Sequence, residues 1–200
     1  ITVGASTPAT VTAVSGTTPQ STRVSTAFST ALAATVTDTY GNLVSGASVT
    51  FATPSTGASG TFAASSGTST VVATNSAGIA TASALTANAT AGSFNATATA
   101  SGGASATYAL TNIPLTPTVT GVSPALGRQA GGDAVTITGT SLSNATAVKF
   151  GTVPAASYAV VSDTSITAVS PAGTGTVDVT VTTAGGTSAR WTTMKPRPAK

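Results

Sequence analysis

The feature that most limits the fold of this chain is a repeated alternation of small apolar and hydroxyl side chains in short runs. Between Leu32 and Asp38, the apolar residues Leu32, Ala34 and Val36 take alternate positions, with Thr35 and Thr37 between them. This period of two is typical of a half-buried β-strand, because successive side chains point to opposite faces. Neither half of the chain shows the apolar repeat of a helix, so the sequence predicts an all-β protein.

The first half contains about seven such runs, separated by turn residues at 40–42 and 75–78. They lie at residues 10–14, 32–38, 49–51, 71–74, 79–85, 94–100 and 108–110. This number and spacing favour a two-sheet sandwich over a barrel.

The pattern stops at Pro114 and Pro117, which lack the backbone donor of a central strand and stiffen a connection. We therefore expect a domain at 1–112 and a linker at 113–117. Seven further runs, at 118–122, 135–137, 148–150, 158–161, 166–168, 177–181 and 189–192, predict a second small sandwich at 118–193. The basic, proline-containing tail at 194–200 is expected to lie outside the sheet, which leaves the last strand short or completed from outside the chain.

The composition removes most catalytic chemistry. The 200 residues include no Cys, His or Glu, which excludes disulfides, thiolate or histidine catalysis and His/Cys metal sites. Only 6% of residues are charged, and the 89 residues between Asp38 and Arg128 carry no ionisable Asp, Glu, Lys or Arg. Polarity comes instead from hydroxyls, including 44 threonines, which interrupt every apolar run well before the length of a membrane span. Four of the seven cations lie in the last eleven residues, so no basic cluster for nucleic acid is expected.

The four carboxylates are placed as structural residues rather than as a catalytic pair. Asp38 and Asp133 stand beside turns, where local backbone hydrogen bonds are the expected role. Asp163 begins a turn, and Asp178 alternates with valines and faces away from the core. A calcium site at 38–42 would have too few oxygen ligands. The sequence therefore predicts no enzyme, no cofactor, and no catalytic or metal-binding residues.

Few side chains suit ligand stacking or cross-linking. Phe51, Phe94, Tyr108 and Phe150 fall on predicted inward faces, which leaves Tyr40, Tyr158 and Trp191 as candidates for stacking on a sugar. Lys149, the only lysine before the tail, alternates with Val148 and Phe150 and should face solvent, away from any isopeptide bond in the core.

The lack of charge leaves the sheet edges poorly guarded against pairing with other strands. Three kinds of cover stay open: the hydroxyl groups by themselves, glycans on Asn88, Asn95 and Asn144, or neighbouring subunits. If subunits do, the candidate pairing segments are Ile1, Thr2 and Val3 at one end and Arg190, Trp191 and Thr192 at the other.

Two stretches resemble known families. Residues 9–112 resemble the bacterial Ig-like domain of the invasin and intimin type, through residues 8–11, ATVTDTYGN at 34–42, VSGASVTF at 44–51 and TNSAGIA at 74–80. Residues 117–192 resemble the IPT/TIG Ig-like domain, through VSPA at 122–125, GGDAVTITG at 131–139, VKFG at 148–151 and PAG at 171–173 before VDVTV.

The resemblance implies two tandem immunoglobulin-like β-sandwiches of a kind found in surface and secreted proteins. It implies a non-catalytic stalk, spacer or adhesion module, outside the cell or on a bacterial surface, and the absence of Cys is compatible with that location. The expected partners are neighbouring Ig-like domains or copies of the chain itself, a glycan, or a host or surface protein. An accessory module that binds carbohydrate for a secreted enzyme is the alternative.

Overall fold

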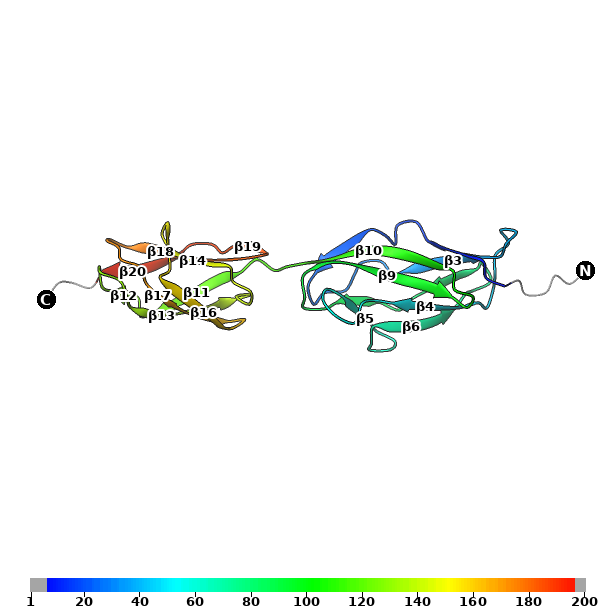
Figure 1. Cartoon of the computed structure of the whole chain (residues 1–200), viewed down its shortest axis with the longest axis horizontal. Helices are drawn as coiled ribbons and strands as arrows, with labels where there is room; N and C mark the ends of the chain where they lie inside the picture. The colour runs from blue at the N-terminus through cyan, green and yellow to red at the C-terminus, as the bar shows by residue number, and fades with distance from the viewer. Residues whose placement is uncertain (1–6, 197–200) are drawn as a thin grey trace, which may run out of the picture. The chain divides into compact units, whose positions relative to one another are not determined.

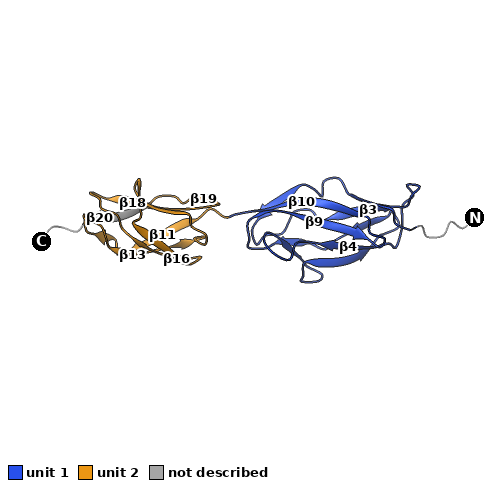
Figure 2. Ribbon diagram, viewed as in Figure 1, with its two compact units in different colours: residues 1–114 blue, residues 115–200 orange. Residues whose placement is uncertain are grey.

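The computed structural model describes residues 7–196, the last five of them by backbone alone. The chain divides into two compact units, residues 1–114 and 115–200 (Figures 1 and 2). This division lies inside the segment 113–117 for which the sequence predicts a linker. The finer domain limits stay a prediction, since strand β10 itself ends at Ile113.

Unit 1 is a sandwich of two main sheets. The three-stranded sheet has the order β1-β3-β7 and the five-stranded sheet the order β2-β10-β9-β4-β6, while β5 and β8 form a separate pair. The strands are β1 (Thr10–Ala13), β2 (Gln20–Arg23), β3 (Ala33–Thr37), β4 (Ser48–Ala52), β5 (Gly60–Phe62), β6 (Ser69–Ala73), β7 (Ile79–Thr81), β8 (Leu85–Ala87), β9 (Gly92–Ala100) and β10 (Ser105–Ile113).

Unit 2 repeats the plan in fewer residues. A four-stranded sheet, β11-β13-β17-β16, faces a sheet in the order β12-β20-β18-β14-β15, with β19 paired to β18. The strands are β11 (Thr118–Ser123), β12 (Leu126–Gly127), β13 (Ala134–Thr140), β14 (Ala147–Phe150), β15 (Val153–Pro154), β16 (Ser157–Ser162), β17 (Ser165–Val169), β18 (Val177–Thr183), β19 (Gly186–Thr187) and β20 (Trp191–Pro196).

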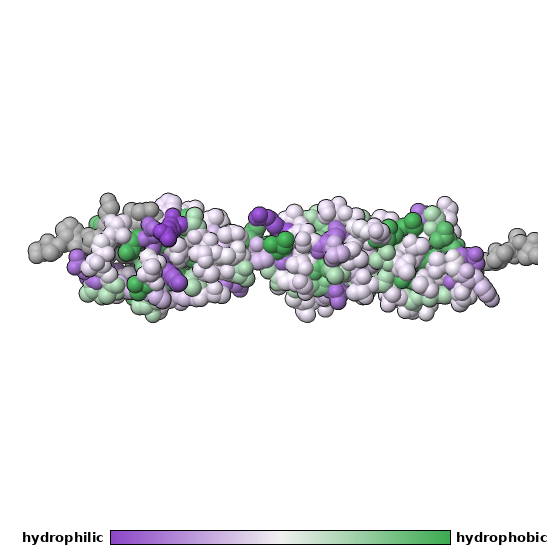
Figure 3. All heavy atoms as spheres, turned by 90° about the horizontal axis from the view of Figure 1, so that it is seen from above, coloured by the Kyte–Doolittle hydropathy of each residue, from purple (hydrophilic) through white to green (hydrophobic). Residues whose placement is uncertain are grey.

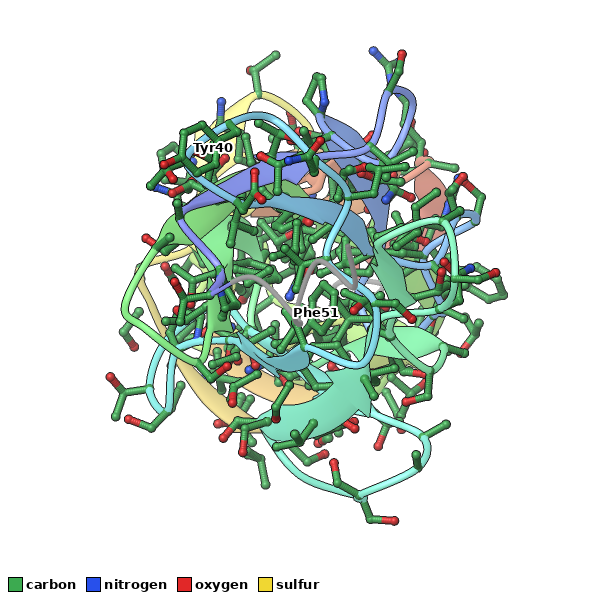
Figure 4. The ribbon with its side chains drawn as sticks, turned by 90° about the vertical axis from the view of Figure 1, so that its right-hand side faces the viewer. Tyr40 and Phe51 are labelled. Carbon is green, nitrogen blue, oxygen red and sulfur yellow. The ribbon has the colours of Figure 1, made fainter. Side chains whose placement is uncertain are left out.

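The cores contain the inward faces expected from the alternation. Phe51, Tyr108 and Phe150 are at most 3% exposed and Phe94 is 8% exposed, which confirms their predicted burial. Figure 4 shows Phe51 in the middle of unit 1. The Tyr108 hydroxyl donates to the Ala33 carbonyl 2.8 Å away, so β10 of one sheet is tied to β3 of the other. Burial raises the pKa of Tyr108 to about 12.

The last strand is longer than the sequence predicts. β20 extends to Pro196, pairs antiparallel with β18, and at Lys195 and Pro196 pairs parallel with Leu126 and Gly127. The prediction that residue 194 begins a segment outside the sheet is therefore wrong for residues 194–196. The physical reason is position, because a proline at the end of a strand costs the ladder little. The two-residue strand β12, too short to recognise from alternation, gives β20 a partner from within the chain.

Each unit carries the chain from one end of its sandwich to the other. In unit 1, the entering strand β1 begins beside the end of β3, whereas β10 ends beside the end of β2. The chain crosses between sheets from β1 to β2, and β2 then runs parallel to β10. Unit 2 does the same with β11, β12 and β20. In both units, the first strand is thus split between the two sheets.

Candidate functional site

The most exposed aromatic side chain stands on a tightly held loop. Tyr40 follows β3 and is 89% exposed, and Figure 4 shows it at the periphery, away from the core. Beneath it, Asp38 is 5% exposed, and its Oδ1 accepts from the backbone N–H groups of Tyr40 (2.8 Å) and Asn42 (2.9 Å). Asn42 Nδ2 donates to Asp38 Oδ2 at 3.0 Å. The predicted turn-forming role of Asp38 is confirmed, and its effect is to fix the backbone that presents Tyr40.

The three stacking candidates lie on three different elements. Tyr40 belongs to unit 1, whereas Tyr158 and Trp191 lie in β16 and β20, which belong to different sheets of unit 2. Tyr158 is 37% exposed, and its hydroxyl donates to the Ala145 carbonyl at 3.2 Å. Trp191 is 36% exposed. Sugar stacking at each separate residue stays a prediction.

The predicted pairing segments give a mixed outcome. Ile1, Thr2 and Val3 lie outside the described residues. Trp191 and Thr192 pair with Val179 and Asp178 of β18, so they belong to a sheet of unit 2, as the predicted strand at 189–192 requires. Arg190 precedes the strand, and its Nη1 lies 3.9 Å from Asp178 Oδ2. Their use in pairing with another chain stays a prediction.

A groove opens at the end of unit 2 where β11 and β20 end. Its volume is about 370 Å³, within the range of about 300–1,000 Å³ typical of ligand pockets. The β14–β15 turn, with Phe150 and Val153, forms one wall, and the β17–β18 loop, with Pro171 and Ala172, forms another. Arg128 stands on the rim.

Polar contacts fix the shape of this end of unit 2. Arg128 Nε donates to Asp133 Oδ1 at 2.9 Å, and the Arg128 backbone N–H donates to Asp133 Oδ2. The Arg128 side chain is still 62% exposed. The Gly173 N–H donates to the Gln129 carbonyl, which ties the β17–β18 loop to the segment after β12. Gly131, at φ +72°, lies so close to Pro171 that a Cβ atom there would clash with backbone.

Comparison with known families and structures now identifies the second unit. Residues 117–194 match the IPT/TIG domain family. Unit 2 is an IPT/TIG domain. No curated protein matches the chain in sequence.

Two solved structures of bacterial proteins resemble almost the whole chain. The crystal structure of invasin, described as a bacterial integrin-binding protein, aligns with a TM-score of 0.52 and 19% identity over 94% of this chain and 39% of that chain. The Yersinia pseudotuberculosis adhesin InvE aligns with a TM-score of 0.56 and 16% identity over 95% of this chain and 63% of that chain. This chain therefore spans less than two thirds of either structure. The expected fold, two tandem immunoglobulin-like β-sandwiches, is confirmed, and the family match confirms the IPT/TIG resemblance of the second.

The remaining carboxylates of the IPT/TIG domain are engaged in structure. Asp163 accepts from Ser143 Oγ at 2.8 Å and from the backbone N–H groups of Ser141 and Ser143, and these bonds, led by the Ser143 hydroxyl, lower the pKa of Asp163. In residues 7–196, no three Asp side chains gather in a group that would hold a metal ion. The same stretch contains no helix long and apolar enough to cross a membrane.

The asparagines of the predicted glycosylation pattern differ in availability. Asn88 Nδ2 donates to the Gly57 carbonyl at 2.8 Å, and Asn88 Oδ1 accepts from Asn112, so a sugar on Asn88 would break an internal network. Asn95 and Asn144 are exposed.

Sequence reasoning missed the groove. The residues that line it were noticed only as marks of a family resemblance, as with the PAG motif at 171–173 and the VKFG motif at 148–151. Three separate turns must meet to form the groove, and local alternation carries no signal for such a meeting.

Proposed function

We propose that this chain is a non-catalytic structural and adhesion module, acting as a stalk, spacer or assembling subunit of a bacterial surface or secreted protein. One observation carries the proposal. In each unit, the second part of the split first strand runs parallel to the last strand of the unit. These pairs are β2 with β10 and β12 with β20. Tension on the two ends of a unit therefore loads these bonds together in shear, rather than breaking them one at a time.

The ladder lengths differ between the units. The β2–β10 pair has four partnered positions, from Gln20–Leu110 to Arg23–Ile113, and Val24 adds a backbone bond to the Ile113 carbonyl at 3.0 Å. The β12–β20 pair has only two partnered positions. A spacer built this way resists extension most strongly in unit 1.

Pulling on single molecules of the whole chain from its two ends tests this role. We expect two unfolding events, with the event that releases the longer segment, unit 1, occurring at the higher force. The two units act as controls for each other in the same trace. Unfolding of both units at the low forces typical of sheets that open strand by strand would contradict the spacer role.

Adhesion is proposed for the same surface-exposed setting. The similarity to invasin and InvE supports a bacterial surface location and a partner on another surface, either a protein or a glycan. The hydroxyl-rich exterior agrees with this setting, since most of the face seen in Figure 3 has intermediate hydropathy. Binding of chain-coated beads to host cells, before and after protease treatment of the cells, separates a protein partner from a glycan. Beads that bind no better than uncoated ones would remove the adhesive part of the proposal.

A further inference from the structure

We infer that strand β16 pairs antiparallel with β16 of a second copy of this chain, so that the four-stranded sheet of unit 2 continues into that of its neighbour. This pairing specifies the assembling role proposed above and rests on it. The strand Ser157–Ser162 ends the sheet order β11-β13-β17-β16, so no described strand lies along its outer side. An edge of this kind presents backbone donors and acceptors that another strand can use.

β16 is an open edge of the core. Tyr158 stands opposite Ala168 of β17, and Val160 stands opposite Ile166. Opposed residues of antiparallel strands share a face, and both β17 residues are at most 3% exposed, so Tyr158 and Val160 belong to the inward face. They are nevertheless 37% and 40% exposed. The opposing sheet ends on this side in the two-residue strand β15, which is too short to cover them.

Two comparable edges are closed. In unit 2, β11 at the far side of the same sheet leads directly into β12 of the opposing sheet, and its inward-facing Val119 is 8% exposed. In unit 1, the edge strand β6 is equally free of charge, but Thr70, which stands opposite the buried Phe51, is also 8% exposed. An added strand would cover little inward-facing surface at these edges, whereas at β16 it would cover Tyr158 and Val160.

β16 is itself the kind of strand that this edge requires. A partner must bring apolar side chains at alternate inward positions and no charge, and residues 151–162 contain no Asp, Glu, Lys or Arg. In a two-fold pair centred on Ala159, Tyr158 of each copy lies opposite Val160 of the other, and aromatic side chains paired with β-branched ones stabilise antiparallel sheets. The two Asp163 carboxylates then lie about eight residues apart along the ladder, roughly 27 Å, where salt screens their repulsion.

The direction of the backbone groups fits this centre. The Ala159 carbonyl lies 3.4 Å from the Thr167 hydroxyl of β17 and so points away from the free edge. Because backbone groups alternate in direction along a strand, those of Tyr158 and Val160 point toward the free edge. Tyr158 of one copy and Val160 of the other can therefore exchange N–H to C=O bonds in both directions. The irregularity in the ladder after Val160 lies outside this paired stretch.

A charge placed at the two-fold axis tests the pairing on the whole chain. Ala159 is exposed and stands opposite the exposed Thr167, so a long side chain fits there without disturbing the core. Sedimentation velocity of the unaltered chain should show a shift from monomer to dimer as the concentration rises, and no larger species, because a two-fold contact closes on itself. Ala159→Lys and Ala159→Glu should each dimerise at least about tenfold more weakly, since like charges then face each other.

The matched control places the same charge on another edge. Val71 is 63% exposed on the edge strand β6 of unit 1, and Val71→Lys should dimerise like the unaltered chain. An equimolar mixture of Ala159→Lys and Ala159→Glu should recover the dimer, because opposite charges then meet at the axis.

A single thiol reads the register of the pair. The chain contains no Cys, so Ala159→Cys introduces one thiol in each copy. In a pair without backbone hydrogen bonds between opposed residues, the Cα atoms lie about 4.5 Å apart, which a disulfide can span. Oxidised glutathione should therefore link Ala159→Cys into covalent dimers much faster than it links Val71→Cys.

Four outcomes would overturn the pairing. An unaltered chain that stays monomeric would do so and would leave this edge to a strand of another protein. Equal weakening of the dimer by Val71→Lys, a charged mixture that stays monomeric, or equal linking of the two thiol variants would do the same. The force needed to unfold a single molecule involves no second copy, so the spacer role stands or fails separately.

Discussion

The two units share one plan but stabilise it differently. Unit 1 ties its layers with buried polar groups, in which the Tyr108 hydroxyl reaches Ala33 and Asn112, fully buried, donates to the Ser59 carbonyl at 2.9 Å. Unit 2 has a core of aliphatic side chains with Phe150 as its only aromatic ring among the described residues, and it leaves a groove beside that ring. The same arrangement of strands therefore forms a closed sandwich in one case and a sandwich with an open end in the other.

This difference separates stability from surface chemistry. The Tyr108 hydroxyl and the Asn112 Nδ2 group of unit 1 bond to partners far apart in sequence, which makes its packing specific. The open end of unit 2 leaves apolar surface in contact with water, a cost that a bound partner would remove. We therefore expect the unfolding free energy of unit 1 to change most on substitutions in its interior. Substitutions in the loops of unit 2 should instead affect what its surface can bind.

The largest expected effect is that of Phe51→Ala. Phe51 is fully buried and its ring centroid lies 6.2 Å from that of Tyr108, so truncation leaves a cavity between the sheets. We expect a loss of about 3–5 kcal/mol in the unfolding free energy of unit 1. Calorimetry should show the unit 1 transition shifting while that of unit 2 stays. Val71→Ala, on the exposed face of the same sheet, should change either transition little, and an equal shift of both would contradict the independence of the units.

The next effect concerns the loop of residues 38–43, which carries Tyr40. Asp38→Ala removes the acceptor of two backbone N–H groups and of the Asn42 side chain, and we expect unit 1 to lose about 1–2 kcal/mol. Asp38→Asn keeps one carbonyl acceptor and should lose less. Urea unfolding curves measure both values. Equal stability of Asp38→Ala and the unaltered chain would show that this loop needs no internal support.

The core of this fold was predictable because its signal is local. Alternation placed Val49, Phe51 and Phe150 inward without knowledge of any partner strand, and all three are buried. The Asp38 turn was predictable for the same reason, since its hydrogen bonds span at most four residues.

The candidate sites were less predictable because they depend on distant pairing. Trp191 and Thr192 were expected in a short last strand, yet this strand continues to Pro196 and gains a partner in Gly127, 69 residues earlier. Tyr40, Tyr158 and Trp191 were grouped by exposure alone, whereas Tyr158 and Trp191 lie in different sheets and Tyr40 lies on a loop of unit 1. Exposure is a local property, whereas convergence on one surface is not.

A smaller effect distinguishes the tie between the layers of unit 1. Tyr108→Phe keeps the ring but removes the bond to the Ala33 carbonyl. This carbonyl still accepts from the Val14 N–H at 2.9 Å, so we expect a loss of about 0.5–1.5 kcal/mol in the unfolding free energy of unit 1.

The raised pKa of Tyr108, about 12, adds a pH dependence. The unfolded tyrosine loses its proton near pH 10 while the folded one holds it, so the stability of unit 1 should fall as the pH rises from about 10 to 12. Calorimetric unfolding of unit 1 should show less of this fall in Tyr108→Phe, and an identical fall would assign it to other groups.

The smallest effect is expected at Asp163, the counterpart in unit 2 of the loop-holding Asp38. Both carboxylates accept hydrogen bonds from backbone N–H groups. Asp163 is exposed, however, and water replaces much of what its bonds provide, so Asp163→Asn should cost unit 2 less than about 1 kcal/mol at pH 7.

Because the pKa of Asp163 is lowered on folding, its contribution to stability is present above the unfolded pKa near 4 and is lost as the pH falls through the folded value. The gap between the unaltered chain and Asp163→Asn should therefore close below about pH 4. Asp178→Asn removes the same charge from β18 and should leave the Asp163 contribution in place. If the gap for Asp163→Asn instead stayed constant down to pH 2, the carboxylate would hold the 141–143 loop by shape alone, and the two units would differ in this respect as well.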